Sequence, residues 1–302
     1  MTQTEKHIWL IDTLNRAGRI SLKNLSEKWE CNVELSCGKP LQRCTLNRWR
    51  NQILLQYGIE IICESNGDYR YYIANPEAIE ENKLRKWMLD SVAVGNVIAS
   101  YKDLGNRIVV QEIPSGRDFL TIVLAAMREN KALCLTYQAF GHDPYTFNIE
   151  PYCLKLHQNR WYVLAKGENG KLWLYSLDRI KNLTSTNKTF SMPKDFDAEA
   201  FFALYFGIIV YDGAKPCRIV LRVYGSHVNY LRTLPLHQSQ KEIYTEEGKY
   251  SDFEYFVAPT YDLSMAILGM GNLVEVLQPA EYRKQIADTV NELAKRYNTK
   301  AT

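Results

Sequence analysis

The spacing of the apolar residues changes along this chain, and that change limits the folds it can adopt more than any other feature. Apolar residues recur at helical spacing in residues 7–57, alternate with polar ones in short runs between 131 and 187, and follow a mixed pattern after 217. A helical period and a strand period cannot share one regular element. At about 100–200 residues per domain, a chain of 302 residues has room for two or three domains. The sequence therefore predicts an α+β protein with several domains.

Residues 1–75 are predicted to form a winged helix-turn-helix domain. Three helical stretches are followed by two β-rich runs that flank Asn66-Gly67, a strong short-range signal for a tight hairpin. The third helix is expected over residues 42–57 and carries Leu46, Trp49 and Ile53 inward. The residues that mark helix ends are Gly18, Ser21 and Gly58. Three helices and a two-stranded wing are typical of proteins that dock one helix into DNA.

The surface of this third helix is basic, although the net charge of the whole chain is only +3. Residues 39–51 contain four basic residues and no acidic one. In the major groove arginine can contact guanine, asparagine can pair with adenine, and threonine can reach a phosphate or a thymine methyl group. The predicted DNA-contacting residues are Arg43, Thr45, Asn47, Arg48, Arg50 and Asn51. A basic face that is merely solvated is the alternative interpretation.

Three further regions are predicted after the winged helix. Residues 76–130 form a helical connector, and residues 131–190 hold about five short strands, the size of a small Sm- or SH3-like β-barrel. Residues 199–302 follow the order strand, strand, helix, strand, helix, which indicates a ferredoxin-like α+β unit. Both the connector and the C-terminal unit have broad apolar faces, so either could mediate dimerisation.

Several classes of protein are disfavoured. The longest uncharged apolar run, residues 201–211, is about half the length needed to span a bilayer, and the N-terminus lacks a secretory signal. The seven cysteines include no CxxC pair and match no zinc spacing. Phosphate-binding loops and nucleophile elbows are also missing from the sequence. We therefore expect a soluble cytoplasmic protein that is not an enzyme and uses no metal or cofactor.

Two motifs resemble the hallmark of the WYL-domain transcriptional regulators. Residues 161–165 read Trp-Tyr-Val-Leu-Ala, and residues 177–180 read Leu-Asp-Arg-Ile at the usual interval. Together with the winged helix and the C-terminal segment, the resemblance covers essentially the whole chain. The chain departs from the family pattern at Val163, where leucine is usual, and at Tyr175-Ser176, where the family often has an arginine.

The resemblance implies a barrel that senses a nucleic-acid or nucleotide effector. Arginine can grip a phosphate with two hydrogen bonds, and tyrosine can stack on a base. The predicted effector-binding residues are Tyr137, Lys155, His157, Tyr162 and Arg179. Structural roles are the alternatives: an ion pair between Arg179 and Asp178, a surface position for His157, and a core position for Trp161.

Taken together, the sequence predicts a homodimeric transcriptional regulator that binds a double-stranded DNA operator. Two recognition helices related by a two-fold axis would read an inverted repeat. The alternative function is a module that binds single-stranded nucleic acid without operator specificity.

Overall fold

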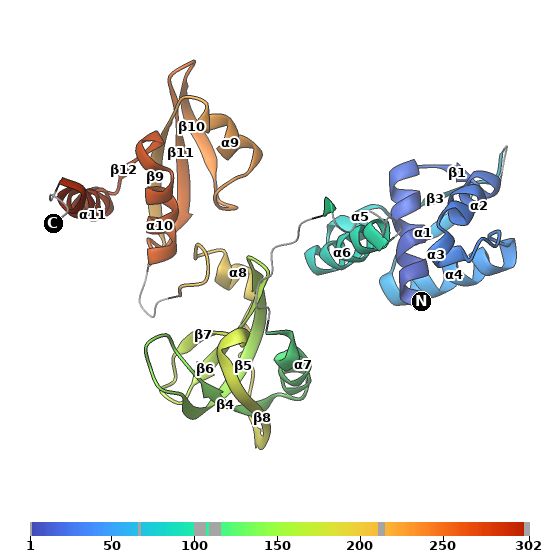
Figure 1. The fold of residues 1–302 in the computed structure, drawn as a ribbon, viewed down its shortest axis with the longest axis horizontal. Coiled ribbons are helices and arrows are strands. Elements are labelled where there is room, and N and C mark those ends of the chain that lie inside the picture. The colour runs from blue at the N-terminus through green and yellow to red at the C-terminus, as the bar shows by residue number, and fades with distance from the viewer. Residues whose placement is uncertain (1, 66–67, 100–106, 109–115, 211–214, 299–302) are drawn as a thin grey trace. The chain divides into compact units, whose positions relative to one another are not determined.

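The chain divides into two compact units, residues 1–111 and 112–302, and each is described separately (Figure 1). The computed structural model describes residues 2–65, 68–99, 107–108, 116–210 and 215–298. The hairpin turn expected at Asn66-Gly67 and most of the turn expected at residues 113–116 lie outside the described residues. Helices and antiparallel sheets occur together, so the predicted α+β class is confirmed.

The N-terminal unit begins with the helices that the sequence predicts. Ser21 caps the second helix by accepting a hydrogen bond from the Asn24 backbone N–H at 3.3 Å, and Gly58 ends the last with a left-handed φ of 65°. Only Val33–Ser36, a short helix, was not expected. The helices are α1 (Gln3–Ala17), α2 (Leu22–Cys31), α3 (Val33–Ser36) and α4 (Arg43–Tyr57).

A small antiparallel sheet and two further helices complete the N-terminal unit. The strands are β1 (Ile20–Ser21), β2 (Ile61–Cys63) and β3 (Arg70–Ile73), in the order β1-β3-β2. The pairing of β2 with β3 confirms the predicted hairpin strands. The helices α5 (Glu77–Glu80) and α6 (Lys83–Ala99) pack through Ile79, Leu89 and Ala93 into the same core. The first part of the predicted connector therefore belongs to this unit.

The second unit begins with a five-stranded antiparallel sheet. A 3-10 turn, η2 (Arg117–Phe119), precedes α7 (Leu120–Glu129), and Val123 and Ala126 of α7 pack against the sheet. The strands are β4 (Lys131–Tyr137), β5 (Tyr145–His157), β6 (Arg160–Gly167), β7 (Leu172–Ser176) and β8 (Ile180–Thr189), in the order β7-β6-β5-β4-β8. A second 3-10 turn, η3 (Leu177–Arg179), joins β7 to β8. Trp161 and Val163 face one core and Leu164 another, as alternation along β6 predicts.

A four-stranded sheet forms the C-terminal part of the second unit. Its strand order, β10-β11-β9-β12, places the first and third strands in the middle. The helix α9 and the strand β10 were not expected from the sequence, whereas the last two helices were. The elements are β9 (Cys217–Tyr224), α9 (His227–Thr233), β10 (Lys241–Glu246), β11 (Tyr250–Val257), α10 (Tyr261–Gly269), η4 (Gly271–Leu273), β12 (Val274–Gln278) and α11 (Ala280–Asn298).

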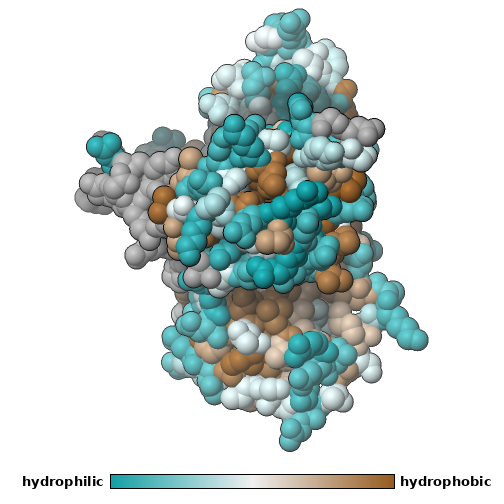
Figure 2. Space-filling view, turned by 90° about the vertical axis from the view of Figure 1, so that its right-hand side faces the viewer, coloured by the Kyte–Doolittle hydropathy of each residue, from teal (hydrophilic) through white to brown (hydrophobic). Residues whose placement is uncertain are grey.

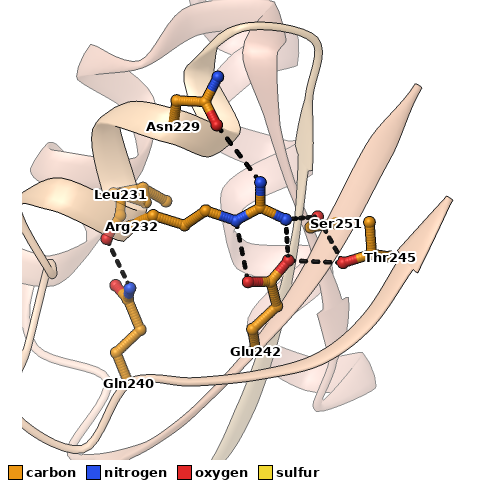
Figure 3. Close-up of polar contacts among 7 residues, drawn as sticks. All are labelled: Asn229, Leu231, Arg232, Gln240, Glu242, Thr245 and Ser251. Carbon is orange, nitrogen blue, oxygen red and sulfur yellow. Dashed lines mark hydrogen bonds and ion pairs between the residues drawn. The ribbon is translucent and has the colours of Figure 1, made fainter. Parts of the chain in front are cut away.

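One arginine fixes α9 to the edge of this sheet (Figure 3). The Arg232 Nε donates to Glu242 Oε2 of β10 at 3.0 Å, and its Nη1 donates to Asn229 at 3.3 Å. A further bond reaches the Ser251 hydroxyl at 3.4 Å. The hydrogen bonds from Arg232 hold the pKa of the Glu242 carboxyl at about 2. All the partners of this guanidinium are internal, so the cluster has a structural role.

Residues 204–210, here called the strap, contact both sheets of the second unit. The short helix α8 (Ala198–Phe202) precedes them. On one side, the Ala258 N–H donates to the Leu204 carbonyl at 2.8 Å, and Phe206 joins the core of the four-stranded sheet. On the other side, Val210 packs with Cys153 and Leu164 of the five-stranded sheet. The strap therefore joins two hydrophobic cores.

Candidate nucleic-acid interface and ligand pocket

The helix α4 turns its polar side chains away from the core, because its apolar residues recur every three or four positions. Leu46, Trp49 and Ile53 are almost fully buried. The predicted DNA-contacting residues that are exposed on α4 are Arg43, Asn47, Arg48 and Asn51. The N-cap residue Gln42 makes no side-chain cap bond, and no acidic residue lies in the first turn. The exposed surface of α4 therefore presents cations and amides, as the sequence predicts.

Two of the predicted residues, Thr45 and Arg50, are only half exposed. The Arg50 Nε donates to the Ile61 carbonyl of β2 at 2.7 Å, and its guanidinium lies 5.6 Å from the Tyr71 ring of β3. Its Nη1 donates to Asn47 Oδ1 at 3.3 Å. Sequence reasoning assigned Arg50 to DNA, and in the structure its guanidinium contacts both strands that follow α4.

The two exposed arginines of α4 have no carboxylate partner within the described part of the chain. Neither Arg43 nor Arg48 forms an ion pair with any of the residues that the structure describes. Elsewhere, for example, Arg19 pairs with Glu64 at 2.5 Å, and Arg222 pairs with Asp252 at 2.7 Å. A cation without an internal counter-ion is available to a phosphate or a base edge.

A buried histidine of α1 packs against the core side of α4. His7 of α1 is only 2% exposed, and its ring lies 6.2 Å from the Trp49 ring. Its Nε2 lies 3.2 Å from Gln52 Oε1 of α4. Burial lowers the pKa of His7, so the ring is neutral at physiological pH. The position of α4 relative to α1 is thus fixed by packing and neutral hydrogen bonds.

Hydropathy alone does not single out α4. The face in Figure 2 is mostly hydrophilic, with apolar side chains showing between the polar ones. On α4 itself Leu54 and Leu55 are exposed by 47% and 87%. Roughly 55–60% of the surface of any folded protein is apolar. The site is therefore identified by its unpaired charge rather than by its polarity.

A second candidate site is an aromatic cavity of about 500 Å³ on the five-stranded sheet. The ring centroids of Tyr145 and Phe147 lie 5.0 Å apart in a stack, and those of Tyr137 and Tyr175 lie 5.4 Å apart edge to face. Trp173 also lines the cavity and is 44% exposed. Burial raises the pKa of Tyr175, so its hydroxyl remains a hydrogen-bond donor. Such a cavity suits a flat aromatic group such as a nucleobase.

Arg179 lies next to this cavity, beside Tyr137. Burial raises the pKa of the Tyr137 hydroxyl, and the Arg179 guanidinium partly offsets that shift. Within the described residues the Arg179 Nε is buried and has no hydrogen-bond partner. The guanidinium lies 3.8 Å from the ring of Phe140, a residue that is 74% exposed. An exposed ring over a half-buried cation is compatible with a site for an anionic ligand.

Asp178 is not the partner of Arg179 in this arrangement. Its Oδ2 lies 3.7 Å from Arg160 Nη1, and its Oδ1 accepts a hydrogen bond from the Ser176 hydroxyl. The ion pair between Arg179 and Asp178 is therefore not formed, and Asp178 lies near Arg160 instead.

The other three predicted effector residues are not part of the aromatic cavity, and one of them contacts the strap. The Lys155 Nζ donates to the Gly207 carbonyl of the strap and lies 4.2 Å from the Phe202 ring. Burial lowers the pKa of Lys155 and also that of His157, which the charge of Lys155 lowers further. Tyr162 is only 5% exposed. None of these three residues lines the aromatic cavity, and the strap contacts Lys155.

Sequence reasoning missed most of the aromatic lining of the cavity. Tyr145 and Phe147, and likewise Trp173 and Tyr175, are two residues apart on their strands. Alternation along a strand places such pairs on one face. This spacing was a usable signal, whereas the position of Phe140 in the loop after β4 has no periodic pattern to indicate it.

Comparisons with known proteins identify two domains in the second unit. The family model described as the WYL domain matches residues 118–185, and the one described as the WCX domain matches residues 215–294. No curated protein matches the chain. Within the described residues, no helix is long and apolar enough to cross a membrane, and no cluster of ligands could hold a metal ion.

Two solved structures also resemble the chain. Proteasome accessory factor B/C (PafBC) of Arthrobacter aurescens shares 20% identity with a TM-score of 0.35, over 94% of this chain and 45% of that one. A CRISPR Cas-related protein shares 11% identity with a TM-score of 0.42, over 90% and 79%. The chain spans about half the length of the PafBC structure. On the two family models, the chain belongs to the WYL-domain proteins, with a WYL domain followed by a WCX domain.

Proposed function

We propose that this protein is a sequence-specific DNA-binding transcriptional regulator. The observation that carries the proposal is the surface of α4, where Arg43 and Arg48 lack carboxylate partners beside the exposed amides of Asn47 and Asn51. Arginine and asparagine can each make two hydrogen bonds to a single base in the major groove. The strands β2 and β3 lie next to this helix and serve as the wing. Membership of the WYL-domain proteins supports the same function.

The aromatic cavity of the WYL domain is the proposed site for an effector. A nucleobase would stack on the exposed rings of Tyr145 and Trp173, and the Arg179 guanidinium would bind a phosphate. The effector is therefore a nucleotide or a short single strand. The protein senses this ligand without transforming it, and we propose no catalytic step.

Regulation further requires that the effector distinguish two states of the protein. The proposed assembly is a homodimer, so that two copies of α4 read an inverted repeat. An effector changes operator affinity only to the extent that it binds one dimer geometry more tightly than the other.

The proposed operator function is tested by titrating the full-length protein onto a duplex from upstream of its own gene and onto a scrambled duplex. Asn47→Ala should lower the preference for the operator by about 1–3 kcal/mol of discrimination, because one bidentate base contact is lost. Asn15→Ala, an exposed asparagine of α1, is the matched control and should have no effect. Equal affinity of the wild-type protein for both duplexes would refute the operator proposal.

A second candidate function, binding of single-stranded nucleic acid as the main activity, is favoured by the exposed aromatic rings of the cavity. Tyr145 and Trp173 could stack on successive bases of an unstructured strand. The same titration separates the two functions when an unstructured oligonucleotide is added as a third ligand. Tighter binding of that strand than of the operator would favour this second function.

A further inference from the structure

A small cavity of about 310 Å³ lies beside α4 in the N-terminal unit. Its lining comes from α1, α2, α3, the connection from α3 to α4, and the first half of α4. Trp29, Leu41 and Trp49 provide buried apolar walls. The polar lining includes Lys6, Lys39, Thr45 and Arg48. Residues far apart in sequence therefore bring several hydrogen-bond donors to one place.

The charged side chains that line this cavity are all positive. Lys6, Lys39 and Arg48 line it, and no acidic residue does. None of the three forms an ion pair with a described residue, and Lys6 is only half exposed. Holding like charges near one another without a counter-ion is unfavourable, and a bound anion relieves that cost. The cavity is thus suited to an anion with several acceptor oxygens.

Two of the other polar side chains of the cavity already have hydrogen-bond partners. The Ser36 hydroxyl accepts a hydrogen bond from the Gly38 N–H at 2.9 Å, and the Gln3 amide lies 2.9 Å from His7 Nε2. The buried Trp49 Nε1 has no hydrogen-bond partner. Within the described residues, the three cations and the Thr45 hydroxyl likewise have no internal acceptor. A phosphodiester offers acceptors to all of them, and a duplex docked on α4 brings its backbone to both sides of the helix.

We propose that this cavity binds one phosphate of the DNA backbone through Lys6, Lys39 and Arg48. The inference rests on the proposed DNA-binding function and adds two contacts from outside α4, on α1 and on the connection before α4. Lys6 and Lys39 would contribute affinity that does not depend on sequence, whereas Asn47 reads bases. The phosphate contact would fix the position of α4 along the groove, while other side chains of α4 contact the base edges.

The test uses Lys6→Gln and Lys39→Gln in the full-length protein, titrated onto the operator duplex and a scrambled duplex at several salt concentrations. Each variant should lower the slope of log affinity against log salt by about one unit, since one phosphate contact is lost. Affinity should fall by the same factor for both duplexes, which leaves the specificity ratio unchanged. Thermal melting should show that both variants fold like the wild type.

Lys86→Gln is the matched control, because it removes the same charge from a lysine that already pairs with Glu80 at 2.5 Å. Its salt slope should equal that of the wild type. If the wild-type protein binds the operator but Lys6→Gln and Lys39→Gln keep its slope, the phosphate cavity is refuted while the proposed function stands. A loss of affinity confined to the operator would also refute it. If the wild type binds no duplex, the proposed function fails as well.

Discussion

Arg179 is the residue whose surroundings most clearly indicate a missing partner. Its Nε is buried without an acceptor among the described residues, and its guanidinium is covered on one side by the exposed ring of Phe140. Leaving a charged donor unsatisfied costs more than the average hydrogen bond contributes, typically about 1–3 kcal/mol. A ligand phosphate would supply the acceptor.

Arg179→Ala should therefore weaken binding of adenosine monophosphate or a short oligothymidylate by about tenfold or more, while operator affinity stays unchanged. A hydrogen bond to a charged group is worth about 1.5–3 kcal/mol, and each 1.4 kcal/mol is tenfold in affinity. Fluorescence anisotropy with labelled ligands measures the change. Lys181→Ala, an exposed cation on the same part of the chain, is the control. Unfolding of the Arg179 variant would instead indicate a structural role.

At the scale of elements, one side chain of α4 makes polar contacts with both strands of the wing. Arg50 of α4 donates to the Ile61 carbonyl of β2 and lies near the ring of Tyr71 on β3. Its contacts therefore connect the helix to both strands of the wing. The relative position of helix and wing decides whether both can reach one duplex.

Arg50→Ala should destabilise the N-terminal unit by about 1–3 kcal/mol, since the part-buried Ile61 carbonyl loses its charged donor. Urea denaturation followed by tryptophan fluorescence measures this change. Arg43→Ala, which removes an exposed arginine of the same helix, should change stability by less than about 0.5 kcal/mol. Equal stability of the two variants would contradict the stabilising role of these contacts.

The elements that the sequence predicts well are those with a strong period and a clear end. The helix α4 has buried residues at regular spacing and stops at Gly58, so both its extent and its exposed side follow from the sequence. The strand β10 gives no such signal, because nearly all of its residues are exposed and no alternation appears. The helix α9 is short and buries only Val228 and Leu231.

Some of the predicted effector residues do not line the aromatic cavity, and strand alternation could not have shown this. Alternation places Lys155, His157 and Tyr162 on particular sides of β5 and β6, but it does not tell which side stays open. The strap, more than 40 residues later in the chain, contacts Lys155. Which face of a strand remains accessible is a tertiary property. Of the predicted effector residues, Tyr137 lines the cavity and Arg179 lies beside Tyr137.

At the scale of the whole molecule, the strap connects the WYL domain to the WCX domain. Asp262 at the start of α10 accepts hydrogen bonds from the backbone N–H groups of Ile208 and Ile209 at 2.7 and 2.9 Å. Gly207 has a φ of 73°, and a Cβ atom there would lie 2.3 Å from Asp262 Oδ2. Lys155 donates to the Gly207 carbonyl from the sheet of the WYL domain. Gly207 thus lies between Lys155 of the WYL domain and Asp262 of the WCX domain.

Asp262→Ala should loosen the strap, because two backbone N–H groups lose their acceptor at a cost of about 1–3 kcal/mol. Hydrogen–deuterium exchange should become faster in residues 204–210 and remain unchanged in α4. Asp288→Ala, on the exposed side of α11, is the control and should leave the exchange of the strap as in the wild type. Unaltered exchange in the Asp262 variant would show that the strap is held by other contacts.

The strap also limits which fragments of this chain can fold on their own. The two family models stop at residue 185 and resume at residue 215, so neither includes it. A fragment that ends at the first position would expose Cys153 and Leu164 to water, and one that begins at the second would lack Phe206. Each fragment would therefore have a hydrophobic core that lacks the strap residues packed against it in the full chain. We therefore expect the WYL and WCX domains to fold stably only when both are present with the strap between them.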